Sequence, residues 1–119
     1  MGSIRRRRLC SAAIRPAPQK PLVYGACFHA QQCAEKYLKA LLIAKKQPFP
    51  KTHDLRLLSN LCTQAGIWVE PDRDQLDLLS LYAVRARYPG DAPTVDDARE
   101  ALKITQAVRR FARKWLGLT

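Results

Sequence analysis

The chain has 119 residues and carries 21 Lys and Arg against 10 Asp and Glu, which gives a formal net charge of +11. This length supports one compact domain with a hydrophobic core, and 47% hydrophobic with 26% charged residues is ordinary for a globular protein. Because no apolar run approaches the roughly 20 residues needed to cross a bilayer, we expect no membrane-spanning helix.

Residues 1–21 are predicted to form a basic, proline-rich and poorly ordered N-terminal segment. Six cations and no acid lie within residues 1–20, and Pro16, Pro18 and Pro21 disfavour a continuous helix. The apolar stretch 9–14 is shorter than the hydrophobic region of a secretory signal. We therefore expect a cytoplasmic protein whose folded, helical domain spans residues 22–119.

The first predicted helix covers about residues 22–46. Mostly apolar residues recur there at steps of three and four, which indicates one buried helical face. Its positions are Tyr24, Cys27, Phe28, Gln31, Ala34, Leu38, Leu41 and Leu42. The run 47–50, with two prolines, ends this helix.

A second helix is predicted from Thr52 or Asp54, either of which could cap it, to Gly66. Trp68 follows in the connection to the next helix, and we expect its large apolar ring to fold back onto the core.

The third and fourth helices are predicted over about 72–88 and 94–116, with Asp72 and Thr94 at their starts and Tyr88-Pro89-Gly90 ending the third. Aspartates lie in the first turns of both helices, and cations gather at the end of the fourth helix. The helix dipole favours both arrangements. Since no stretch alternates with a period of two, strands are not expected. The sequence predicts an all-α, antiparallel four-helix bundle.

The positive charge gathers in two segments. Residues 1–20 are the first, and residues 99–114 are the second, with six cations against Glu100 alone. Such a field attracts polyanions and makes their binding depend on salt. A solvated basic face with a flexible basic tail explains the same charges without a ligand.

The cysteines and acidic residues do not predict a metal site or a cofactor. Cys10, Cys27, Cys33 and Cys62 include no C-x-x-C pair, and Cys27, His29 and Cys33 fall on different faces of a helix. Free thiols in a reducing compartment fit better. The paired aspartates are explained by their positions at helix starts.

The two histidines and one run of arginines and tyrosines are the side chains that could bind a ligand. His53 stands at a helix start, where an imidazole can order the loop or contact a phosphate beside the helix amides. The segment 81–89 places Arg85, Arg87 and Tyr88 near a helix end, a combination that can hold phosphate and stack on a base. In the structural alternative, Tyr82 covers the core and Arg87 satisfies helix-end carbonyls or an acid.

Three segments together resemble the HEPN domain family, which occurs in prokaryotes and at the end of the eukaryotic protein sacsin. Residues 28–42 (FHAQQCAEKYLKALL) resemble its signature helix. Lys51-Thr52-His53-Asp54-Leu55 and Ala86-Arg87-Tyr88-Pro89 are similar to its T-H-D-L and R-Y-P segments. The likeness covers about residues 22–116.

The resemblance implies a helical bundle that pairs as a homodimer and, in many prokaryotic members, acts with a minimal nucleotidyltransferase as a toxin–antitoxin pair. The catalytic branch of the family cleaves RNA without a metal, through an arginine followed after a short gap by a histidine. This sequence lacks that pair, so the protein is not expected to be an efficient enzyme. It also lacks the family's first amphipathic helix, which is missing or degraded within residues 1–21.

The leading hypothesis is a non-catalytic or weakly catalytic module that binds nucleotide or RNA. Its contact residues would be Lys51, His53, Arg85, Arg87 and Tyr88. One alternative is a metal-independent ribonuclease toxin, with a histidine (His53 or His29) as general acid or base and an arginine such as Arg87. Another is a structural dimerisation domain in which Glu35, Lys36 and His53 are polar contacts beside the core.

Overall fold

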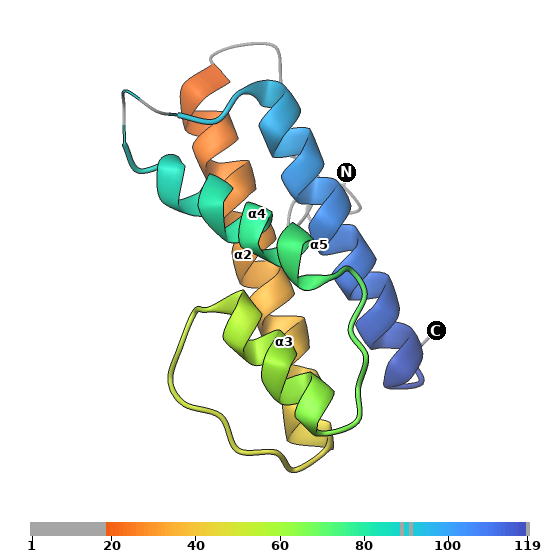
Figure 1. Ribbon diagram of the computed structural model, residues 1–119. Coiled ribbons are helices and arrows are strands. Elements are labelled where there is room, and N and C mark those ends of the chain that lie inside the picture. Colours follow the sequence, from red (N-terminus) through yellow and green to blue (C-terminus); the bar gives the residue numbers. More distant parts are fainter. Residues whose placement is uncertain (1–18, 89, 91, 119) are drawn as a thin grey trace.

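The computed structural model describes residues 19–88, 90 and 92–118, and within these ranges the chain is helical and contains no strand. Four helices follow one another: α2 (Gln19–Ala44), α3 (Leu55–Gln64), α4 (Arg73–Arg85) and α5 (Val95–Trp115) (Figure 1). The predicted all-α bundle is confirmed. Each of the four predicted helices corresponds to one of these elements.

The expectations for the N-terminus fall mostly on residues that the structure does not describe. The basic segment and the missing first helix were predicted within residues 1–21, of which residues 1–18 lie outside the described part. The first described helix, α2, begins at Gln19, slightly before the predicted start at residue 22.

The long helix α2 forms the centre of the bundle and packs against each of the other three helices. Its most extensive contact is with α5, and the two helices run in the same direction (Figure 1). The facing residues are small and fully buried, among them Ala30 and Ala34 on α2 and Ala98 and Ala101 on α5. Small side chains let the helix axes approach closely.

A buried hydrogen bond fixes the register between α2 and α5. The hydroxyl of Thr105 donates to the backbone carbonyl of Ala30 over 2.8 Å, and Thr105 is fully buried. Larger side chains fill the rest of the core, led by Leu38, Leu41 and Leu42 on α2 and by leucines of α3 and α4. These contacts hold α2 in a fixed position in the bundle.

The predicted helix caps are present. Asp54, rather than Thr52, caps α3, while Asp72 caps α4 and Thr94 caps α5. Thr94 and Asp97 form a reciprocal capping box. These caps satisfy backbone amides that would otherwise have no partner at each helix start.

The expectation for Trp68 is wrong, and the end of α3 explains why. Gly66 adopts a φ of +91°, and the amide of Ile67 donates back to the carbonyl of Cys62 over 2.8 Å. In this type of helix end the residue after the glycine packs onto the helix it has just left. Ile67 is accordingly 1% exposed, and Trp68, the next residue, is directed outward and is 74% exposed.

Among the described residues, no helix has both the length and the apolar character needed to span a membrane.

Candidate functional site

The loop before α3 is attached to the side of α2. The side-chain amide of Gln31 donates to the backbone carbonyl of His53 over 2.9 Å. One helical turn further along α2, the carboxylate Oε1 of Glu35 accepts from Nδ1 of His53, also over 2.9 Å. Because Gln31 and Glu35 are four residues apart, they share one face of the helix and hold His53 through both its backbone and its ring.

Glu35 is a nearly buried carboxylate, 8% exposed, with two basic partners. Its Oε2 accepts from Nζ of Lys39 over 2.8 Å, and its Oε1 accepts from His53. Burial alone would raise the pKa of Glu35, but the hydrogen bonds from Lys39 and His53 and the positive charge of these groups outweigh it and hold the pKa below its ordinary value. Glu35 is therefore ionised in the folded protein at neutral pH.

The lowered pKa of Glu35 predicts a loss of stability in acid. A carboxylate whose pKa is lower in the folded than in the unfolded protein stabilises the fold above its unfolded pKa, and this contribution disappears as the pH falls through the folded value. We expect Glu35→Gln to lower the free energy of unfolding by about 1 kcal/mol at neutral pH, since both partners remain partly in water. The difference from wild type should shrink below an ordinary glutamate pKa of 4.5.

Chemical denaturation at a series of pH values between about 7 and about 3 measures this difference. The control is Glu70→Gln, which removes the same charge from an exposed side chain. A Glu35→Gln deficit that stays constant down to the lowest pH would show that the carboxylate contributes by packing rather than by charge.

The first backbone amides of α3 donate to the side chain that caps the helix. Oδ1 of Asp54 accepts from the amides of Arg56 and Leu57 over 3.0 and 3.2 Å, and the hydroxyl of Thr52 accepts from the amide of Asp54 over 3.0 Å. The amides of Arg56 and Leu57 are thus occupied, which disfavours the idea that a phosphate sits on them. Of the two roles predicted for His53, ordering the loop is the one that the contacts show.

A groove with a volume of about 450 Å³ lies between the first half of α2, this loop and the second half of α4. Its lining residues are Phe28, Gln31, Gln32, His53, Asp54, Ser80, Ala83, Val84 and Arg87. We call it the His53–Arg87 groove. The guanidinium carbon of Arg87 lies 5.8 Å from the centre of the Phe28 ring, a cation–π distance. The His53 side chain is 86% exposed, so most of its ring faces solvent although Nδ1 is engaged.

The structure brings two of the five predicted contact residues to this groove, His53 and Arg87. Lys51 and Tyr88 do not line it, but they are exposed and lie within two residues of a lining residue. Arg85 is half-buried in the last turn of α4 and also does not line it. Tyr82, as the structural alternative expects, is buried in the core.

The groove also has lining residues that were not predicted as ligand contacts. They are Phe28, Gln31, Gln32, Asp54, Ser80, Ala83 and Val84. Helical spacing could have grouped most of them, since Phe28, Gln31 and Gln32 follow one another at helical steps, as do Ser80, Ala83 and Val84.

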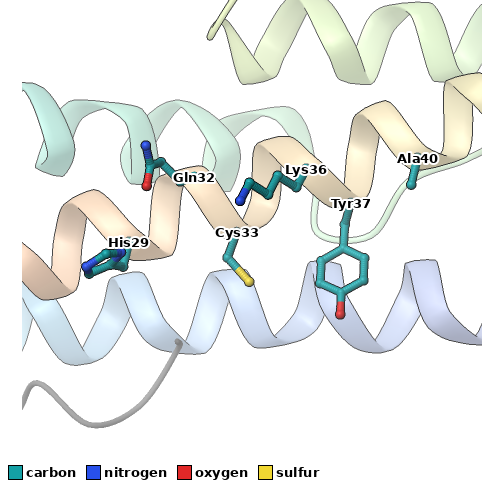
Figure 2. Close-up of a pocket in the computed structure, with 6 residues that line it drawn as sticks. All are labelled: His29, Gln32, Cys33, Lys36, Tyr37 and Ala40. Atoms are coloured by element: carbon teal, nitrogen blue, oxygen red, sulfur yellow. The ribbon is translucent and has the colours of Figure 1, made fainter. Parts of the chain in front are cut away.

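A second, smaller hollow of about 290 Å³ lies on another face of α2. Its described lining comes entirely from α2: His29, Gln32, Cys33, Lys36, Tyr37 and Ala40 (Figure 2). His29, the other histidine, therefore does not share the groove of His53. Lys36, which the structural alternative named with Glu35 and His53 as a polar contact beside the core, lines this outer face.

Cys27 and Cys62 are free thiols, and no group of three or more side chains among the described residues could hold a metal. Cys27 and Cys62 are buried, and burial raises the pKa of each thiol to about 11, with Asp97 adding to the shift at Cys27. Both thiols are therefore protonated at neutral pH and are poor nucleophiles.

Comparison with known families identifies the fold. The HEPN domain matches residues 16–115, which is most of the chain. This protein belongs to the HEPN family. Comparison with curated proteins and with solved structures gives no match.

The three HEPN-like segments of the sequence meet at the His53–Arg87 groove. The signature helix is part of α2 and supplies Phe28, Gln31 and Glu35. The T-H-D-L segment is the loop that carries His53, and the segment after α4 carries Arg87. In this HEPN domain the segments therefore contact one another directly, through Glu35 with His53 and through Phe28 with Arg87.

Proposed function

We propose that this HEPN protein is a module that binds nucleotide or RNA through the His53–Arg87 groove. The observation that carries the proposal is the meeting of Arg87, the exposed ring of His53 and the face of Phe28 in one groove. Arg87 would hold a phosphate, as guanidinium groups do, and Phe28 would support a base or ribose. Lys51 and Tyr88 would extend the contact at its margins. Arg85 would add to the positive field from the last turn of α4.

We further propose that the protein acts as a homodimer and with a minimal nucleotidyltransferase in a toxin–antitoxin-type system. The family resemblance supports both partners. Exposed apolar side chains at the groove support the dimer. Phe28 and Val84 line the groove, and Leu81 is exposed one helical turn before Arg85. A second copy covering these side chains would also close the groove on one side.

One observation favours a second candidate function, a metal-independent ribonuclease. The hydrogen bond from Nδ1 of His53 to Glu35 holds the imidazole in place and leaves its other nitrogen available to exchange a proton with a ribose hydroxyl. Arg87 in the same groove would stabilise the negative charge that develops on the phosphate. The sequence has no histidine at the family's usual distance after an arginine, so we keep binding as the first proposal.

Direct binding tests the proposal. Fluorescence anisotropy of labelled ATP and of a labelled RNA of about 12 nucleotides is measured with the full chain at about 50 and about 200 mM salt. We expect binding that weakens as salt rises. No binding of either probe at the lower salt would overturn the proposal. Cleavage of the RNA in the presence of a chelator, abolished by His53→Ala, would establish the ribonuclease instead.

A further inference from the structure

A third hollow is lined by residues from the last turns of α5 and by Glu70 in the connection between α3 and α4. It has a volume of about 580 Å³ and shares no lining residue with the His53–Arg87 groove. Its lining residues are Glu70, Ala107, Arg110, Phe111, Lys114 and Trp115. We call it the α5 cleft.

The α5 cleft combines cations with aromatic rings. Arg110 and Lys114 are four residues apart on α5 and both exposed, and neither forms an ion pair with another described residue. Phe111 and Trp115 form a second pair at the same spacing. Phe111 packs on the core, while Trp115 is 40% exposed, so part of its ring is open to a ligand. Alternating positive and aromatic side chains fit a nucleic acid strand, whose phosphates and bases alternate.

The positive charge continues along α5 beyond the cleft. At 100° per residue, Arg99, Lys103, Arg110, Arg113 and Lys114 fall within an arc of about 100° on the side of α5 that faces away from the core. From Arg99 to Lys114, over 15 residue steps, this basic ridge extends about 22 Å. Among ion pairs between described residues, its members take part in one, Arg99 with Asp96 at 3.5 Å, and both of these side chains are mostly exposed. A ridge of this length exceeds what one mononucleotide can contact.

We propose that the α5 cleft and the basic ridge form a binding site for single-stranded nucleic acid. The strand would follow the ridge with its phosphates on Arg110 and Lys114, and one base would stack on the exposed ring of Trp115. Glu70, which lines the cleft from the connection between α3 and α4, would repel phosphate and so keep the backbone of the strand on the α5 side. An acidic protein surface would satisfy the cations but would leave the exposed Trp115 ring without a stacking partner, so we favour the nucleic acid.

The fluorescence of Trp115 provides a local readout. The chain has two tryptophans, so a full chain carrying Trp68→Phe keeps Trp115 as its only one. Titration with an oligouridylate and an oligothymidylate of about 12 nucleotides each should quench this fluorescence. The two oligonucleotides distinguish RNA from DNA, and quenching by either supports the site.

The charge of the ridge is tested by two matched arginines. Arg110→Ala is expected to weaken binding about fivefold and to reduce the slope of log K against log salt by about 0.7, the value for one lost phosphate contact on a single strand. Arg109→Ala removes the same charge from an exposed neighbour on the other flank of α5, and it should leave that slope nearly unchanged. Equal losses in the two variants would show that only net charge matters and would overturn the site.

The aromatic contact is tested separately, by anisotropy of the labelled oligonucleotides. Trp115→Ala should weaken binding about tenfold and Trp115→Phe much less, because a phenyl ring still stacks. Circular dichroism confirms that each variant is folded. Polyglutamate that binds as tightly as the oligonucleotides, and is insensitive to Trp115→Ala, would indicate a protein partner and overturn the proposal. Because Arg87 lies in a different groove, an effect of Arg110→Ala without one of Arg87→Ala would support this site and count against the proposed function.

Discussion

Arg87→Ala is expected to weaken the binding of labelled ATP or RNA by about 10- to 100-fold while the protein stays folded. Arg87 lies beyond the end of α4, is exposed, and lies 5.8 Å from the Phe28 ring rather than in a buried ion pair. Its removal therefore leaves no buried charge without a partner. A charge-assisted hydrogen bond to phosphate contributes about 1.5–3 kcal/mol, which sets the expected loss. Anisotropy at low salt measures the affinity, and circular dichroism measures the melting temperature.

The matched control for Arg87→Ala is Lys45→Ala. Lys45 is an exposed cation in the turn after α2 and is not among the residues that line the groove, so it tests the effect of net charge alone. We expect a decrease of less than about threefold for this variant. Equal losses in the two variants would mean that the long-range field, rather than the groove, attracts the ligand.

Local sequence signals were sufficient to predict the helices. The apolar period places α2 and α5, and Asp54, Asp72 and Thr94 mark helix starts because a short polar side chain can accept from the first free amides. Trp68 shows where such signals fail. Hydrophobicity alone favoured its burial, but the left-handed Gly66 directs Ile67 to the core and leaves its neighbour outside. The geometry of the turn, rather than the size of the side chain, decided which residue was buried.

The site was predicted less completely because it depends on how distant segments meet. Glu35 and Lys36 are neighbours in the sequence, but on a helix neighbouring side chains point about 100° apart. Only Glu35 can reach His53, while Lys36 belongs to the outer face (Figure 2). Similarly, Arg85 is within α4, whereas Arg87 lies beyond its end. The helical period therefore does not predict where the Arg87 side chain points. Its contact with Phe28 required the tertiary structure.

Leu38→Ala is expected to lower the free energy of unfolding by about 2–5 kcal/mol. Leu38 is fully buried on the helix that contacts all the others, and its backbone carbonyl also accepts from Sγ of Cys62 over 3.8 Å. Removing three carbons from this position loses apolar burial and leaves a cavity that α2 and α3 can close only in part. Urea denaturation measures the change. Ile43→Ala is the matched control on the same helix, because Ile43 is 66% exposed and its truncation should change stability by less than about 0.5 kcal/mol.

Leu38→Ala and Arg87→Ala together separate the bundle from the groove. At a temperature where Leu38→Ala is still folded, its affinity for labelled RNA should equal that of wild type, because Leu38 does not line the groove. Arg87→Ala should show the reverse, a lost affinity with an unchanged melting temperature. If Leu38→Ala reduced affinity as much as Arg87→Ala while folded, the groove would depend on the exact packing of α2, and ligand binding would be coupled to the core. If neither variant changed affinity, the HEPN-like segments would serve only to hold the bundle together.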